Sequence, residues 1–201
     1  MSKPESRYKA DIAGGSLKLR ESRIIAGLLL DGVDSEIWKN AIEVQNVLQK
    51  RSIGTAKRQA SLIRIRLERM DRELWKMVHS GSTIIATQSI FAASIKHSTL
   101  LGDFLDLVVR EQFRMFGTNL SRLMWGKFLE DCRERDPQMP EWADSTADKL
   151  GDSVFRILDE VGYITDTGSM MLNHVRIAGE VMAYLQDHNE KYVLKCIQVA
   201  I

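Results

Sequence analysis

Apolar residues recur at spacings of three and four along much of the chain, which is the period of amphipathic helices. The most regular set consists of Ala56, Ala60, Ile63, Leu67 and Met70. It predicts a helix that begins near Thr55, where Ser52 and Thr55 are both able to cap its start. Another helix is expected from Asp34 or Ser35. Residues 35–70 therefore have the order helix, turn, helix.

The stretch 82–95 is apolar almost all round, which favours a helix buried in the middle of the fold. Further along, two strand-like runs within 163–177 flank Asp166-Thr167-Gly168, a hairpin type of turn. This hairpin follows two predicted helices, and that order is typical of a winged helix. We predict a mainly α fold, a helical bundle with an N-terminal helix-turn-helix and a C-terminal winged-helix unit. The predicted divisions are a flexible lead-in at 1–15, a helical domain at 16–117 and a second helical unit at 118–201.

Positive charge is concentrated in the predicted helix-turn-helix, although the formal charge of the 201-residue chain is only +1. Between Lys50 and Arg69, seven basic residues stand against one acid, Glu68. The first two turns of a recognition helix point into the major groove of DNA. We therefore expect Lys50, Arg51, Lys57, Arg58 and Arg64 to neutralise phosphates, and Ser52, Thr55 and Ser61 to offer shorter hydrogen bonds. The competing interpretation is that these bases only solvate a helix face.

The second unit has the opposite charge. Residues 127–160 hold ten acids, which phosphates would repel, so a winged helix here fits a protein partner better than DNA. The four histidines lack metal-ligand spacing, and no nucleophile or nucleotide-binding motif is present. We therefore expect no metal, no cofactor and no enzymatic activity. Cys132 and Cys196 have no CxxC spacing, which favours a reducing, cytoplasmic setting. No apolar run is long enough to cross a bilayer, so we expect no membrane contact.

Several segments of the chain have a distinctive sequence: LKLRESRIIAGLLLDG (17–32), LQKRSIGTAKR (48–58), IKHSTLLGDF (95–104), VVREQFRMF (108–116), RDPQMPEW, DSVFRILDEVGYI and YVLKCIQV. Together they resemble the BrxA family of bacterial BREX phage-defence systems. The resemblance implies a cytoplasmic, nearly all-helical protein with a fold likened to the RNA-binding protein NusB. It also implies a non-enzymatic DNA-binding role, because the catalytic activities of these systems belong to other proteins. No DNA contact is carried over from the family to a residue of this chain.

These observations favour a DNA-binding accessory protein that grips duplex DNA mainly through phosphates. One alternative is a protein-interaction scaffold that contacts other BREX proteins. Another is a NusB-like RNA binder, which the lack of an aromatic platform on the basic face disfavours. The oligomeric state, the DNA sequence preference and the role within the defence system stay open from sequence alone.

Overall fold

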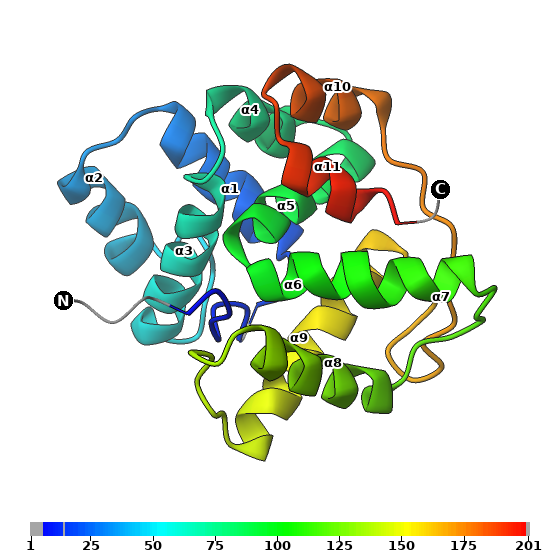
Figure 1. Ribbon diagram of the computed structural model, residues 1–201. Coiled ribbons are helices and arrows are strands. Elements are labelled where there is room, and N and C mark those ends of the chain that lie inside the picture. Colours follow the sequence, from blue (N-terminus) through cyan, green and yellow to red (C-terminus); the bar gives the residue numbers. More distant parts are fainter. Residues whose placement is uncertain (1–5, 14, 200–201) are drawn as a thin grey trace, which may run out of the picture.

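The computed structural model describes residues 6–13 and 15–199, and it is built mainly from α-helices (Figure 1). The helices of the first half are α1 (Leu19–Leu30), α2 (Ser35–Lys39), α3 (Ile53–Leu67), α4 (Arg72–Ser80) and α5 (Thr83–His97). Those of the second half are α6 (Thr99–Phe104), α7 (Arg110–Arg114), α8 (Arg122–Arg135), α9 (Asp144–Val161), α10 (Gly179–Asp187) and α11 (Lys191–Ile197). Two π-helical segments, η1 (Asn40–Val44) and η2 (Leu105–Val109), continue α2 and α6 without a break.

Helix α5 lies at the centre of the molecule, as its apolar sequence predicts (Figure 1). It packs against α1, α3 and α4 from the N-terminal part and against α9, α10 and α11 from the C-terminal part. One cluster of buried apolar side chains runs from Tyr8 to Val199 and includes residues of both predicted units. The division at 117/118 remains a prediction, and the two parts share this core.

Local chemistry sets the helix starts around α3. The Asp34 carboxylate accepts hydrogen bonds from two N–H groups at the start of α2, and the Ser52 hydroxyl accepts one from the Thr55 N–H. Asp71 does the same for α4. The predicted helix therefore begins at Ile53, two residues before Thr55. The segment that joins η1 to α3 is longer than the three- or four-residue turn of a typical helix-turn-helix.

The winged-helix hairpin predicted at 163–177 is not supported, because no strands form there. The turn itself forms: the Asp166 carboxylate accepts hydrogen bonds from the Ser169 hydroxyl and from the Ser169 and Gly168 N–H groups, which lower the pKa of Asp166 to about 2. The described residues contain no strand on either side of it, only isolated antiparallel bridges at Ile164–Leu172 and Asn119–Met171. The segment before α8 supplies partners for the second arm, because the Leu172 N–H donates to the Thr118 carbonyl. The arms also bond to each other, through the Thr165 N–H to the Met171 carbonyl and the Asn173 N–H to the Tyr163 carbonyl, but over too short a stretch to form the strands of a wing.

The predicted flexible lead-in is also corrected for its described part, residues 6–13 and 15. Tyr8 and Ile12 are fully buried in the core. Hydrogen bonds hold the backbone nearby, including one from the Arg7 N–H to Asp136 and one from the Ser98 hydroxyl to Asp11. Residues 1–5 and 14 lie outside the described residues. Across the described ranges, none of the helices combines the length and apolarity that a bilayer crossing requires.

Candidate nucleic-acid interface

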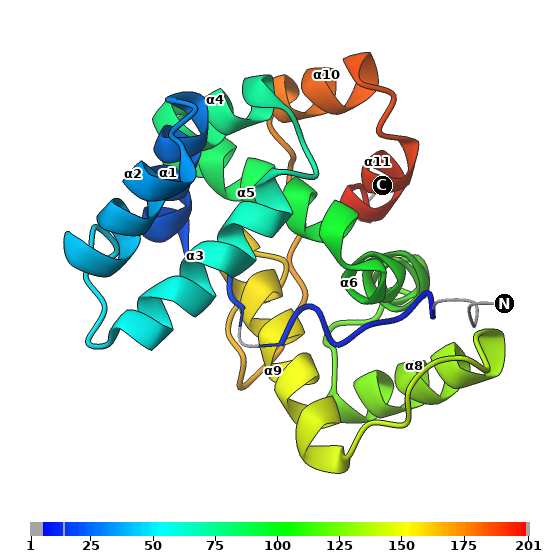
Figure 2. The ribbon, with the colours of Figure 1, turned by 90° about the vertical axis from the view of Figure 1, so that its left-hand side faces the viewer.

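Helix α3 and the segment before it form an outward surface of the N-terminal half (Figure 2). The apolar stripe of α3 packs against α1, η1 and α5, so the opposite side is open to solvent. All eight predicted site residues lie on this helix or in the segment immediately before it. Their surroundings divide them into three groups.

The first group is exposed and unpaired. Arg51, Arg58 and Ser61 are exposed and have no ion pair or side-chain hydrogen bond within residues 6–13 and 15–199. Arg51 precedes the start of α3, and Arg58 follows in its second turn. These two guanidinium groups are therefore available to an anionic partner, and an exposed arginine suits a phosphate because its N–H donors form a planar fork.

The second group consists of bases that already contact carboxylates. Lys57 Nζ lies 3.0 Å from the Glu43 carboxylate of η1, and Lys50 pairs with Glu21 of α1. Arg64 Nε lies 2.7 Å from Glu68, and its guanidinium stacks 4.5 Å above the centre of the Trp38 ring. These acids make the net positive charge of the α3 surface smaller than the number of its basic residues suggests. Phosphates would have to compete with them for the same cations.

The third group caps the helix. The Ser52 hydroxyl accepts the Thr55 N–H at 3.2 Å and donates to the Thr55 hydroxyl oxygen at 2.9 Å. Both side chains therefore serve the start of α3. Their primary role in the structure is to fix the direction in which the helix leaves the preceding segment.

A shallow hollow of about 290 Å³ separates η1 from α3. Its lining residues are Trp38, Ile42, Glu43, Lys57, Ser61 and Arg64. The structure thus brings Lys57, Ser61 and Arg64 together, one turn apart along the same face of α3. Arg51 and Arg58 lie outside this hollow.

Arg66 contributed to the sequence count of bases but is not part of this surface. It is only 1% exposed, and its guanidinium donates to the Ser16 carbonyl at 3.0 Å. Burial lowers the pKa of Arg66 to about 10, so the group stays protonated at neutral pH. Arg66 therefore fastens the segment before α1 to the inner face of α3 and does not face a partner.

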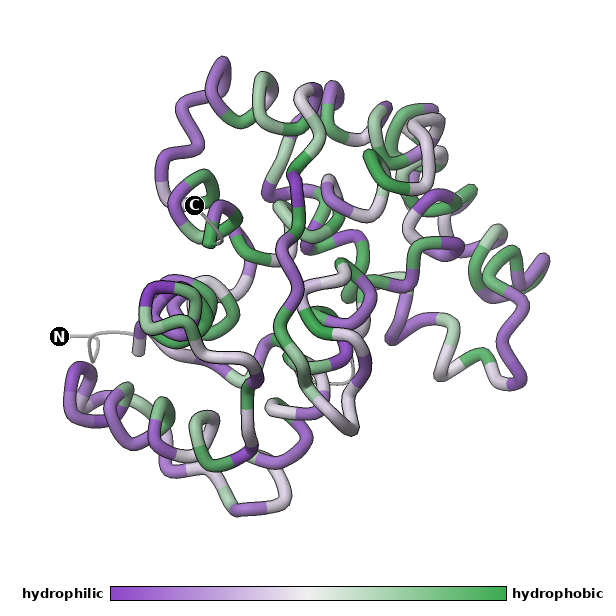
Figure 3. Tube along the Cα trace, turned by 90° about the vertical axis from the view of Figure 1, so that its right-hand side faces the viewer, coloured by the Kyte–Doolittle hydropathy of each residue, from purple (hydrophilic) through white to green (hydrophobic). Residues whose placement is uncertain are grey.

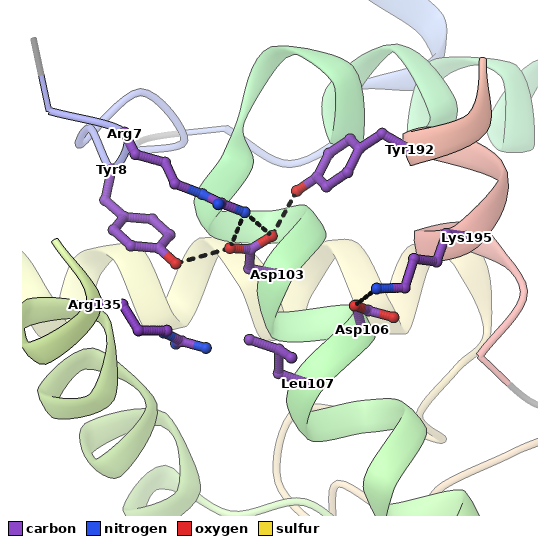
Figure 4. Close-up of a pocket in the computed structure, with 8 residues that line it drawn as sticks. All are labelled: Arg7, Tyr8, Asp103, Asp106, Leu107, Arg135, Tyr192 and Lys195. Carbon is purple, nitrogen blue, oxygen red and sulfur yellow. Dashed lines mark hydrogen bonds and ion pairs between the residues drawn. The ribbon is translucent and has the colours of Figure 1, made fainter. Parts of the chain in front are cut away.

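A second cluster of charged residues surrounds a cavity of about 280 Å³ between the N-terminal segment, α6, α8 and α11 (Figure 4). At its centre the Asp103 carboxylate accepts two hydrogen bonds from Arg7, at 3.0 and 2.7 Å. The hydroxyl groups of Tyr8 and Tyr192 donate to it as well, at 2.8 and 2.9 Å. Burial raises the pKa of both tyrosines, so their hydroxyl groups stay protonated and remain donors.

The Asp103 cluster fastens distant parts of the chain to one another. One helical turn away, the Asp106 carboxylate of η2 accepts one hydrogen bond from Arg110 Nε at 3.0 Å and lies 2.6 Å from Lys195 Nζ. Each carboxylate is thus satisfied by donors of this chain, which is the pattern of a structural clasp. Sequence reasoning did not find this cluster, because its members come from residues 7 to 195 and no spacing connects them. Within the described residues, no group of three or more histidine, cysteine or acidic side chains is placed to hold a metal ion.

These features define an all-helical protein with exposed arginines concentrated at the start of one helix. The chain belongs to the BrxA family, whose model matches residues 6–189. This confirms the resemblance seen in the sequence.

Three curated relatives carry the name "BREX protein BrxA". The one from Paramagnetospirillum magneticum (strain ATCC 700264 / AMB-1) is 68% identical over 197 residues, which cover 98% of this chain and 99% of that protein. The one from Escherichia coli O9:H4 (strain HS) is 33% identical over 198 residues, covering 98% and 93%. The one from Bacillus cereus (strain H3081.97) is 27% identical over 161 residues, covering 80% of each.

A crystal structure of an uncharacterized protein from Magnetospirillum magneticum is similar to this fold with a TM-score of 0.91. The sequence identity is 66%, and the match covers 96% of this chain and 99% of that chain.

Proposed function

We propose that this chain is a non-enzymatic, cytoplasmic component of a BREX phage-defence system that binds duplex DNA through the start of α3. The observation that supports the proposal most directly is the pair of exposed arginines, Arg51 and Arg58, which have no carboxylate partner in the described chain. They lie at the end of a helix whose N–H groups and dipole also favour a phosphate. Lys57 and Arg64 join them when phosphates displace Glu43 and Glu68.

Most of the contact energy in this proposal comes from phosphates. The exposed face of α3 holds no asparagine or glutamine placed to read a base edge, so we expect weak sequence preference and a dissociation constant on the order of 10⁻⁶ M at modest salt. Each neutralised phosphate contributes a slope of about −0.9 in log affinity against log salt concentration. Contacts from Arg51, Lys57, Arg58 and Arg64 therefore give a slope of roughly −3 to −4.

The test is a fluorescence-anisotropy titration of labelled duplex DNA against the wild-type chain and the double variant Lys57→Glu/Arg58→Glu, at several salt concentrations. We expect binding to be lost in the variant, while circular dichroism stays unchanged and the thermal midpoint falls only slightly, because both side chains are exposed and the Lys57–Glu43 pair contributes little. The matched control is Arg72→Glu/Lys76→Glu on α4, which makes the same change in net charge on exposed positions away from α3. A folded α3 variant that binds DNA as well as the wild type would contradict the proposal.

A protein-interaction scaffold is the second candidate, and the acids of the α3 surface favour it. Glu21, Glu43 and Glu68 give this surface mixed charge, which suits a protein partner better than a phosphate backbone. A pull-down of other BREX proteins in the presence of nuclease distinguishes the two functions, because a DNA-bridged contact disappears and a direct contact survives. Competition between duplex DNA and RNA tests the NusB-like alternative in the same titration.

A further inference from the structure

An apolar surface on the other side of the molecule is not explained by DNA binding. The connection from α7 to α8 carries Met115 and Phe116, whose side chains are 71% and 92% exposed. Leu123 in the first turn of α8 is 83% exposed, and Met171 in the loop after α9 is 54% exposed. Large apolar side chains gathered in this way mark interaction sites more often than single ones do. We call these four residues the Phe116 surface.

The segments that carry this surface are held side by side (Figure 3). The Leu120 N–H donates to the Met170 carbonyl at 2.9 Å, and Asn119 forms an antiparallel bridge with Met171. A groove of about 370 Å³ opens between them. Its lining residues are Phe113, Phe116, Gly117, Thr118, Met171, Leu172 and His174. The groove is therefore built on hydrogen-bonded backbone and exists without a partner.

Phe116 occupies a position just after a helix that glycine usually occupies. Its φ angle is 55°, in the left-handed region, and it follows the last turn of α7. The Phe116 N–H donates to the Phe113 carbonyl and the Gly117 N–H to the Gln112 carbonyl, which is the pattern of a Schellman motif. Glycine or asparagine is favoured at this position because a larger side chain is strained there. Phe116 thus adds strain while its side chain stays 92% exposed, and a contact with another molecule would offset that cost.

The charges around the Phe116 surface indicate the chemistry of the partner. Residues 107–127 hold four bases, of which Arg110 pairs with Asp106 and Arg122 with Asp152, so only two of them bear on the chemistry of a partner. Lys127 lies one turn after Leu123 on α8 and has no ion pair within residues 6–13 and 15–199, while Arg114 only approaches Glu111 at 3.9 Å. Asp166 in the neighbouring loop uses its carboxylate for its own turn. An apolar surface flanked by Lys127 and the weakly paired Arg114 fits a segment that combines apolar side chains with carboxylates.

We propose that the Phe116 surface binds a protein partner through an acidic amphipathic segment, with Phe116 as the central contact. Phenylalanine and methionine are enriched in protein interfaces, and two of the four side chains are flexible methionines that adapt to a partner. A single-stranded nucleic acid also stacks on an exposed aromatic ring, but three of these four side chains are not aromatic and offer no stacking platform. The partner contacts this surface independently of α3.

The experiment uses three labelled synthetic peptides and the full chain. The first peptide is an amphipathic helix with leucine and phenylalanine on one face and glutamate on the other. The second replaces every glutamate with lysine, and the third replaces the apolar face with serine and glutamine. We expect fluorescence anisotropy to show binding of the first peptide at least about tenfold tighter than of the other two.

The decisive variant is Phe116→Asn, because asparagine tolerates the left-handed conformation. We expect it to lose binding of the acidic peptide at least about tenfold and to keep or raise the thermal midpoint. The matched control, Ile84→Gln on α5, removes a 64% exposed apolar side chain elsewhere and should leave peptide binding unchanged.

The other outcomes overturn the proposal. One is equal binding of the acidic and basic peptides, and another is no binding of any peptide by the folded chain. A third is single-stranded DNA bound in preference to the acidic peptide and lost in Phe116→Asn, which identifies a nucleic-acid platform. A fourth is self-association in sedimentation that Phe116→Asn abolishes, which identifies a second copy of the chain as the occupant.

Discussion

The α3 surface and the Asp103 cluster both bring arginine together with carboxylates, but they differ in how completely the charges are satisfied. Asp103 is buried and accepts four hydrogen bonds from side chains of its own chain. At the start of α3, Arg51 and Arg58 are exposed and have no such partner among the described residues. A count of charges along the sequence treats the two alike. Burial and pairing separate a structural clasp from a surface that is available for binding.

The largest expected effect is the loss of the clasp in Asp103→Ala. This change leaves the Arg7 guanidinium, the buried Tyr8 hydroxyl and the part-buried Tyr192 hydroxyl without their shared acceptor. We expect the free energy of unfolding to fall by about 3 kcal/mol. This value is at the low end of the range for breaking a buried ion pair, because the Arg7 side chain is itself exposed to solvent. Urea denaturation measures it. The control Asp131→Ala removes an exposed carboxylate one turn before Arg135 and should change stability by less than about 0.5 kcal/mol. Equal losses in the two variants would remove the distinction between clasp and surface.

A smaller effect is expected for Arg66→Met, which tests whether a base on α3 is structural when it is buried. The variant loses the hydrogen bond to the Ser16 carbonyl but also removes a buried charge, so we expect a cost of about 1–2 kcal/mol. DNA affinity of the folded variant should stay within about twofold of the wild type, because an arginine that is 1% exposed cannot reach a phosphate. Thermal melting and the anisotropy titration measure the two quantities. A tenfold loss of affinity in the folded protein would place Arg66 among the binding residues.

The parts of the fold that depend on neighbouring residues were predictable from the sequence. The spacing from Ala56 to Leu67 gives α3, with Met70 just beyond its end, and the caps at Ser52 and Asp71 act within three residues along the chain. Arg66 had a readable signal as well, because it follows Ile63 by three positions and so falls beside the buried stripe. The charge count ignored that spacing.

The parts that depend on distant partners were not predictable. The Asp103 cluster joins residues that are 89 to 96 positions apart. The loop after α9 contains the predicted Asp166 turn, but its arms pair partly with residues 118–120, which no local pattern reveals. The exposure of Phe116 was not predictable either, because the segment VVREQFRMF has the pattern of an ordinary helix end.

The smallest expected effect concerns the ion pair between Lys57 and Glu43. This pair is intermediate between the fully paired, buried Asp103 and the exposed Arg51 and Arg58, which are unpaired within the described part of the chain. The pair joins α3 to η1 across 3.0 Å, and the lysine side chain is more exposed than the carboxylate. An exposed pair of this kind contributes about 0.5 kcal/mol or less. A phosphate therefore displaces Glu43 at little cost, and we expect Lys57 to contribute about half as much to DNA binding as an unpaired base.

The variant Glu43→Gln tests this intermediate state by freeing Lys57 without changing the shape of the side chain. We expect duplex DNA affinity to rise about two- to threefold at low salt, and the slope of log affinity against log salt to steepen by up to about 1. The control Glu36→Gln removes an exposed carboxylate of α2 that has no ion pair in the described chain, so it separates the release of Lys57 from the general gain in positive charge. Equal gains from both variants would mean that Lys57 is no more restrained than Arg58. In that case an ion pair at an exposed position has no measurable effect on DNA binding. Burial alone would then decide whether a base of this chain is structural or able to bind a partner.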